Sequence, residues 1–240
     1  NLKTGPGEVH AIMGPNGSGK TPTVGLLLGL LRPTSGTFNL FGSSDGHEKS
    51  LRRFGAIIES PSFYPYLSGL QNLKYFQMIS GGGPERELER LLDRVGLSGR
   101  GDDPFRTYSL GMKQRLGIAY SLLGDPDLVF LDEPTNGLDP EGMIEIRELI
   151  RSLGNDNRTV LLSSHLLHEV DQICDSVTII SRGKLIAQGE VSQLVAAAGS
   201  EQVRAKTTDD GKARRILAGL HWVENVTTHN NSLLVTAPIE

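Results

Sequence analysis

The sequence predicts an α/β protein whose core is a parallel β-sheet flanked by helices. Short, wholly apolar runs such as LVFL at 128–131 are typical of strands buried on both faces of such a sheet. A glycine-rich stretch, GPNGSGKT at 14–21, lies between one predicted strand and a predicted helix. Strand and helix patterns then alternate along the first 195 residues, which is the order that builds a parallel sheet.

Each element has its own local signal. EVHAIM at 8–13 reads as the first strand, and the apolar run at 24–31 as the helix behind the glycine-rich stretch. Gly-rich breaks precede a helix at 85–95, and Ser109 is placed to cap a helix over 110–122. The remaining strands are predicted at 128–131, 159–162 and 177–180. After about residue 195 the pattern changes to strand, helix (212–220), strand, strand, which predicts a small and incomplete α+β appendage at 196–240.

Composition narrows the class of protein. Of 240 residues, 38% are hydrophobic and 22% charged, the net charge is -4, and Cys174 is the single cysteine. No strong basic field is present to attract nucleic acid. The longest apolar run falls short of the ~20 residues of a spanning helix, and the first ten residues lack the apolar core of a signal peptide. We therefore expect a cytoplasmic protein whose membrane role, if any, comes through a partner.

The glycine-rich stretch fits a phosphate-binding loop. Its glycines let successive N–H groups face phosphate oxygens, and the following helix offers its positive N-terminal end. Lys20 would neutralise the β- and γ-phosphates, and the Thr21 hydroxyl would ligate Mg²⁺. The predicted ATP-binding residues of the loop are Gly14, Pro15, Asn16, Gly17, Ser18, Gly19, Lys20 and Thr21.

Pro22 is an unusual residue at this place. Proline is tolerated in a first helical turn, but those N–H groups are the ones that a phosphate needs. Pro22 removes one donor and biases Thr21 away from the α region. Because a charge-assisted hydrogen bond is worth roughly 1.5–3 kcal/mol, we predict weakened but not abolished nucleotide binding.

Two acidic residues follow the strand at 128–131. Asp132 is placed to contact Mg²⁺ and Glu133 to act as general base on the attacking water. Ser109 and Gly111, at the start of the helix over 110–122, offer a second anion site. Taken alone, that second feature is more often an ordinary helix cap.

Together these motifs resemble the ATPases of ABC transporters. The order is the phosphate loop, Ser109-Leu-Gly111-Met112-Lys-Gln, Leu128–Asp132 with Glu133, Asn136-Gly-Leu-Asp139 and Ser163-Ser-His165. The resemblance covers about residues 5–195. It implies the ABC-type P-loop fold with a helical subdomain at about 60–125, and two protomers that pack head to tail. ATP would then lie between one phosphate loop and the partner's Ser109–Met112 segment.

The resemblance also assigns further site residues. Asp139 would lie at the dimer seam, and His165 would contact the γ-phosphate and orient the water. Glu59 stands where the family usually has the glutamine that touches Mg²⁺ or water and senses the membrane partner. His168, three residues after His165, has no third ligand nearby, so we do not expect a metal pair there.

Three departures from the usual family motifs indicate which branch of the family this sequence resembles. The signature Ser-Leu-Gly-Met, Glu59 and Asn-Gly-Leu-Asp resemble ATPases of the bacitracin and lantibiotic export group, as does the tail after Gly189. The segment at 7–20 is instead similar to the ATPase of iron–sulfur cluster assembly. None of residues 1–19 is aromatic, although the family usually stacks such a ring on adenine. We therefore expect that the sequence begins late in its domain, at a cost to ATP binding of about 1–3 kcal/mol.

Phe63, Tyr64 and Tyr66 lie beside Glu59. In the family this region receives the coupling helix of the permease, but the rings are equally suited to packing the helical subdomain.

The function predicted is the ATP-hydrolysing subunit of an ABC exporter, using ATP and Mg²⁺. Its partners would be a second ATPase protomer and a separate permease at the inner face of the cell membrane, with antibiotic-like, lipid or peptide substrates. Two alternatives stay open: a soluble ABC ATPase of assembly or repair, and an ATP-binding module with impaired hydrolysis.

Overall fold

The computed structural model describes residues 4–42, 50–58, 62–156, 158–198, 201–205, 207, 209–220, 223, 225–229 and 232–237. Contacts divide the chain into two compact units, Asn1–Val191 and Ser192–Glu240. In the described part of the chain, no helix is long and apolar enough to cross a lipid bilayer.

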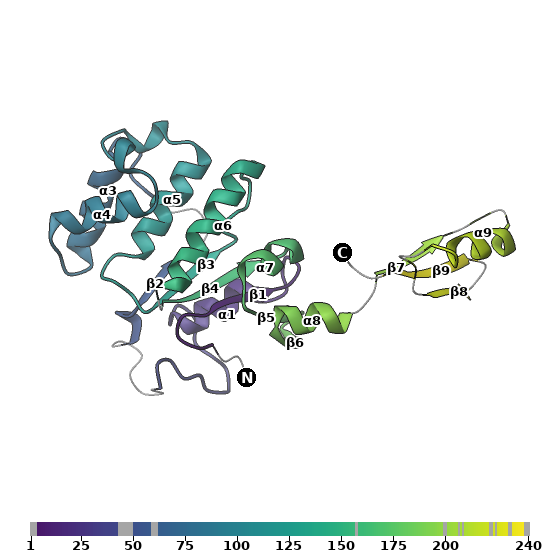
Figure 1. Ribbon diagram of the computed structural model, residues 1–240. Helices are drawn as coiled ribbons and strands as arrows, with labels where there is room; N and C mark the ends of the chain where they lie inside the picture. The colour runs from purple at the N-terminus through teal and green to yellow at the C-terminus, as the bar shows by residue number, and fades with distance from the viewer. Residues whose placement is uncertain are drawn as a thin grey trace. The chain divides into compact units, whose positions relative to one another are not determined.

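A six-stranded sheet forms the centre of the first unit (Figure 1). Its strand order is β2-β3-β4-β1-β5-β6, parallel except for β6, which is antiparallel to β5. The parallel sheet that the apolar runs predict is thus confirmed. The strands are β1 (Val9–Met13), β2 (Phe54–Ile57), β3 (Leu128–Asp132), β4 (Thr159–Ser164), β5 (Ser176–Ser181) and β6 (Lys184–Glu190).

Helices cover both faces of this sheet. On one face, Ile12, Phe130 and Leu161 pack against Val24 of α1 (Lys20–Leu27). On the other face, α6 (Pro140–Asn155) approaches β1 so closely that a Cβ on Gly154 would lie 2.8 Å from Val9. The short helix α7 (Leu167–Ile173) follows β4.

The helix behind the glycine-rich loop differs from the prediction. It begins at Lys20 rather than Val24, so Thr21 and Pro22 both lie inside it. The bias of Pro22 against a helical Thr21 is therefore overridden. The helix also ends at Leu27 instead of Leu31, because Gly29 adopts a left-handed backbone (φ 71°) that stops the chain from continuing as a helix.

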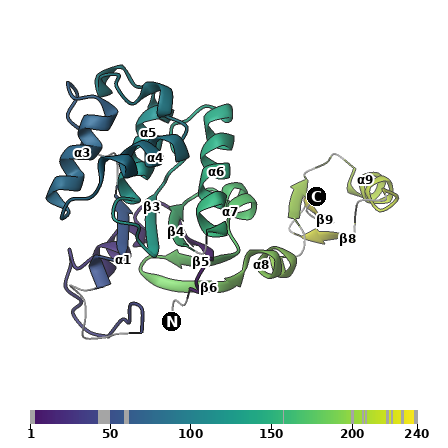
Figure 2. The same cartoon turned by 60° about the vertical axis from the view of Figure 1, so that its left-hand side comes forward.

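A helical subdomain lies beyond β2 and gathers at one end of the sheet (Figures 1 and 2). Leu73, Leu88 and Leu116 are fully buried within it. Ser68 begins the first of its helices with a capping box formed with Gln71. The elements are α3 (Gly69–Ile79), α4 (Glu85–Arg94), the 3₁₀ turns η1 (Ser98–Arg100) and η2 (Phe105–Thr107), and α5 (Leu110–Ser121).

The second unit has its own small core. Three antiparallel strands in the order β7-β9-β8 bury Val226, Leu233 and Val235 against Ala213 and Leu217. Its elements are α8 (Val191–Ala198), β7 (Glu201–Ala205), α9 (Asp210–Leu217), β8 (Asn225–His229) and β9 (Ser232–Ala237). The strand–helix–strand–strand order agrees with the sequence pattern.

Candidate functional site

The glycine-rich loop follows β1 and is fixed by the neighbouring hairpin. The Gly183 N–H in the β5–β6 turn donates to the Ser18 carbonyl (2.8 Å), and the Gly14 N–H donates to the Ser164 carbonyl (3.4 Å). Gly14 itself has no room for a side chain, since a Cβ there would lie 2.2 Å from the Ile180 carbonyl oxygen. The loop is therefore held open as a backbone cradle at the carboxyl end of β1.

Lys20 is buried at the centre of this cradle. Its side chain is 7% exposed, and its Nζ donates to the Gly14 carbonyl (2.6 Å) and lies 3.5 Å from Glu133 Oε1. A buried ammonium needs such partners, because burying an unpaired charge is costly. Phosphate oxygens would bind the same ammonium group. In the structure, the Glu133 carboxylate provides the negative charge that balances it.

Asp132 ends β3, Glu133 follows it, and Ser163 hydrogen-bonds both residues. Asp132 pairs in register with Ser163 of β4, which lies between β3 and β1. The Ser163 hydroxyl donates to Asp132 Oδ1 and accepts the Glu133 N–H (3.0 Å). Glu133 has φ +44°, a left-handed backbone that is uncommon outside glycine and is often found at functional sites. Ser163 therefore holds both acidic residues in place, each through one hydrogen bond.

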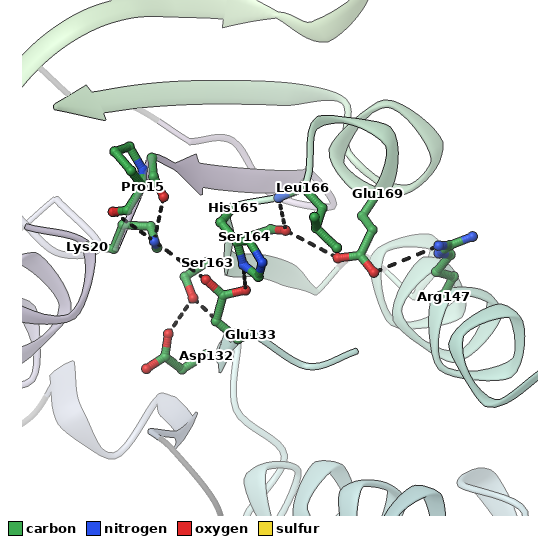
Figure 3. Close-up of polar contacts among 11 residues, drawn as sticks. Pro15, Lys20, Asp132, Glu133, Arg147, Ser163, Ser164, His165, Leu166 and Glu169 are labelled. Carbon is green, nitrogen blue, oxygen red and sulfur yellow. Dashed lines mark hydrogen bonds and ion pairs between the residues drawn. The ribbon is translucent and has the colours of Figure 1, made fainter. Parts of the chain in front are cut away.

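His165 joins this group from the loop after β4. Its Nδ1 lies 2.8 Å from Glu133 Oε2, while its side chain is 40% exposed (Figure 3). Lys20, Glu133 and His165 thus converge from the carboxyl ends of three adjacent strands, β1, β3 and β4. In open α/β sheets this edge is where ligands bind.

Ser109 and Asp139 cap two helices outside this cluster. The Ser109 hydroxyl accepts the Met112 N–H (3.2 Å), and Asp139 Oδ1 accepts the Gly142 N–H (3.3 Å). Among the described residues, no recorded hydrogen bond joins either segment to the loop at 14–21. The two helix starts instead pack on one another, since a Cβ on Gly137 would lie 3.2 Å from Leu110. Gly111 faces Leu138 in the same contact.

The predicted aromatic trio divides into two kinds of residue. Phe63 is buried and makes edge-to-face contacts with Phe76, Phe105 and Tyr120. Tyr66 is 84% exposed and lines a cavity of about 370 Å³ in the helical subdomain. Other residues that line it are Ser68, Leu70, Gln71, Lys74, Glu85, Asp102 and Pro104. Phe63 is therefore a packing residue.

The predicted metal contacts are only partly covered by the described residues. Glu59 lies outside the described residues, so its predicted contact with Mg²⁺ or water stays a prediction. The described part of the chain holds no cluster of three His, Cys, Asp or Glu side chains able to bind a metal ion. Of the residues predicted to bind Mg²⁺, Asp132 and Thr21 lie within the described part of the chain.

Ser163, Ser164 and Glu169 were not given roles by the sequence. Ser164 and Glu169 lie behind His165 and are almost fully buried. The register of β3 against β4 places Ser163 beside Asp132, and the sequence does not reveal that register.

Comparison with known proteins agrees with these motifs. Residues 1–136 match the family described as ABC transporter. The chain is 44% identical over 191 residues to the bacitracin transport ATP-binding protein BcrA of Bacillus licheniformis, covering 78% of this chain and 62% of that protein. It is 43% identical over 190 residues to the lantibiotic transport ATP-binding protein SrtF of Streptococcus pyogenes, covering 79% of this chain and 82% of the other. The chain thus spans less than two thirds of the length of the bacitracin relative.

A solved structure has the same fold. The cbiO1 protein of Clostridium perfringens, described as part of the ABC transporter complex cbiONQ, superposes with a TM-score of 0.73 at 30% identity. The match covers 82% of this chain and 83% of that one.

Proposed function

Because this chain belongs to the ABC transporter family, we propose that it binds and hydrolyses ATP as the ATP-binding subunit of an ABC exporter. A separate membrane permease would carry the substrate. The observation that carries the proposal is the convergence of Lys20, Glu133 and His165 at the carboxyl edge of the sheet. The exporter branch is supported by relatives that are named as bacitracin and lantibiotic transport proteins.

Lys20 would act first, as ATP enters. Its ammonium lies between the Gly14 carbonyl and Glu133, so incoming phosphate oxygens replace the carboxylate as its counter-charge. Exchanging one anionic partner for another avoids leaving the buried ammonium unpaired. The same exchange releases Glu133 Oε1 from Lys20.

Glu133 would then serve as general base. Its carboxylate takes a proton from the water that attacks the γ-phosphorus. His165, bonded to Glu133 through Nδ1, fixes the orientation of that carboxylate and would direct its other ring nitrogen toward the γ-phosphate. The positive φ of Glu133 and its N–H bond to Ser163 keep the carboxylate from turning away.

Mg²⁺ suits the donors present here. Hard oxygen ligands are what this ion prefers, and it usually takes one or two carboxylates together with substrate phosphates and water. Asp132, oriented by Ser163, and the Thr21 hydroxyl at the start of α1 would hold it. Bound there, Mg²⁺ would neutralise charge on the β- and γ-phosphates.

A second protomer would complete the site. Ser109 caps α5, whose first turn includes Gly111 and Met112, and Asp139 caps α6, so that both helix starts lie on one shared surface. Helix N-termini attract anions, so this surface is suited to cover a nucleotide bound to a partner subunit. The exposure of both caps supports this role.

The permease would engage the cavity around Tyr66. This cavity lies in the helical subdomain, about 370 Å³ in volume, and Tyr66 projects into solvent beside it. A short helix of a membrane partner fits such a groove. The chain would then lie against the inner face of the cell membrane, and its substrates would be antibiotic-like, lipid or peptide compounds.

Two other functions remain as alternatives. A soluble ABC ATPase of assembly or repair would use the same edge of the sheet without a permease. An ATP-binding module with impaired hydrolysis is favoured by one observation, that Pro22 takes a donor from the first turn of α1.

Turnover of Mg-ATP by the full chain tests the proposal. Glu133→Gln should keep ATP binding and lose turnover by at least about 100-fold, as expected for a general base. Glu148→Gln, the same change at an exposed position of α6, is the matched control and should behave as wild type. Binding without turnover in the wild-type chain would instead select the impaired module. Co-purification of a membrane protein separates the exporter from the soluble ATPase.

A further inference from the structure

A buried carboxylate lies behind the loop that carries His165. Glu169, in the first turn of α7, is 3% exposed. Its Oε2 accepts the Ser164 hydroxyl (3.2 Å), and the same hydroxyl oxygen accepts the Leu166 N–H (3.1 Å). Ser164 and Leu166 flank His165 in the chain, so one carboxylate fixes both neighbours of the ring (Figure 3).

The charge of Glu169 is balanced from a different helix. Arg147 of α6 places Nη2 3.8 Å from Glu169 Oε1, and its Nη1 donates to Gln172 Oε1 (2.6 Å). Both charged side chains are largely buried, at 14% and 4% exposure. Glu169 Oε1 has no hydrogen-bond partner in the described structure. One oxygen of the carboxylate is therefore committed to the His165 loop, and the other is held by charge alone.

This arrangement limits how the Ser164 hydroxyl can turn. A hydroxyl has a single proton, and here it goes to Glu169, which leaves a lone pair for the Leu166 N–H. Without the carboxylate, the hydroxyl can donate elsewhere and the loop loses its anchor. Ser164 also contributes the carbonyl that accepts the Gly14 N–H, so the anchor reaches the phosphate loop as well.

We propose that Glu169 is a positioning residue for His165, acting through Ser164 and oriented by Arg147. The proposal rests on the proposed ATPase function, because the ring that it positions is the one bonded to Glu133. A purely structural role would be different: Glu169 would then only join α6 to α7, and its loss would act through stability.

Steady-state kinetics of the full chain separate these two roles. Glu169→Ala should lower kcat for Mg-ATP by about 10- to 100-fold, the range for a misplaced catalytic group, and leave KM within about twofold. Glu169→Gln should restore most of kcat, because its amide oxygen still accepts the Ser164 hydroxyl. Val170→Ala is the matched control: it weakens the same helix at the next, fully buried position, and its apolar side chain takes no part in these hydrogen bonds. Equal losses in Glu169→Ala and Val170→Ala would overturn the proposal.

A double variant tests whether Glu169 acts through His165. In a His165→Ala chain, Glu169→Ala should cause no further loss of kcat, since the ring that it positions is gone. Independent losses that multiply would contradict the proposal.

A readout without turnover keeps the two proposals distinct. The imidazole NMR signals of His165, identified by their loss in His165→Ala, should shift in Glu169→Ala and stay in place in Val170→Ala. Unchanged signals overturn the positioning role whatever the kinetics show. If the wild-type chain turns over Mg-ATP no faster than Glu133→Gln, the proposed function fails, while the NMR signals still decide whether Glu169 fixes the ring.

Discussion

Pro22 is expected to weaken the binding of ATP by this chain. The helix α1 has Gly19 as its N-cap, so Lys20, Thr21 and Pro22 are its first three residues. Their N–H positions have no acceptor within the helix and are available to a ligand. The next N–H, of Thr23, already donates to the Gly19 carbonyl (3.0 Å). Proline therefore removes one of three donors at the place where phosphate is proposed to bind.

The size of the effect follows from that count. A hydrogen bond to a charged group is worth about 1.5–3 kcal/mol, and each 1.4 kcal/mol is tenfold in affinity. Pro22→Thr should therefore tighten Mg-ATP binding by about 10- to 100-fold. Because Pro22 is exposed, the change costs no packing. It should instead lower the free energy of unfolding of the ATP-free chain by about 0.4–1 kcal/mol, since proline restricts the unfolded chain.

Isothermal titration calorimetry and urea unfolding measure these two opposite changes. Pro22→Ala serves as the control for the side chain, because it restores the N–H without adding a hydroxyl. Equal gains in the threonine and alanine variants would assign the effect to the N–H. If both variants bind Mg-ATP within twofold of wild type, the reasoning is refuted.

Four residues elsewhere give further expectations. Phe63→Ala should lower the free energy of unfolding by about 3–5 kcal/mol, because it leaves a cavity in an aromatic core. Tyr66→Ala should change that free energy by under about 0.5 kcal/mol and reduce only permease-coupled transport. Urea unfolding measures the first effect, and transport in vesicles measures the second. Burial lowers the pKa of His10 below 6.5, against the opposing effect of Glu8, so its contribution to stability is complete above pH 6.5 and is lost as pH falls toward the folded-state pKa. The drop in unfolding midpoint from pH 7 to pH 5 should be smaller in His10→Gln, and an equal drop would contradict this. Burial raises the pKa of Cys174 to about 12, so the folded chain should resist iodoacetamide at pH 8 and react only after unfolding in urea; rapid labelling of the folded chain would count against it.

The fold was largely predictable because its signals are local. Short strand-like segments, three of them apolar runs without alternation, locate β1, β3, β4 and β5 to within about one or two residues. Caps at Ser109 and glycine breaks locate helices for the same reason. The strands β2 and β6 were not predicted, and the start of α1 was misplaced: the apolar run suggested Val24, whereas the structure places it at Lys20. An apolar pattern reports which residues face the core, not where the first hydrogen-bonded turn forms.

The site was predictable where one residue type performs one task. Lys20 stands out as part of the glycine-rich loop, and Asp132 and Glu133 stand out because they follow a buried strand in a chain that also carries that loop. Ser163 and Glu169 do not stand out, since serine in a strand and glutamate in a helix are ordinary. Their roles depend on strand order, which places β4 between β1 and β3, and on the packing of α7 against α6. Both are long-range properties that no local pattern encodes.

The helix α6 connects the two parts of the proposed mechanism. Asp139 caps its N-terminus, on the surface proposed to cover a partner's nucleotide, and about two turns later the helix carries Arg147, which balances the charge of Glu169. A helix is stiff over that distance, about 12 Å at 1.5 Å per residue. A partner that pressed on Asp139 would therefore displace Arg147, and with it the carboxylate proposed to anchor the His165 loop. On this reasoning, closure of a dimer would bear on the ring of the same subunit, and Arg147→Met should weaken the dependence of turnover on protein concentration. A variant that keeps that dependence would confine Arg147 to balancing charge.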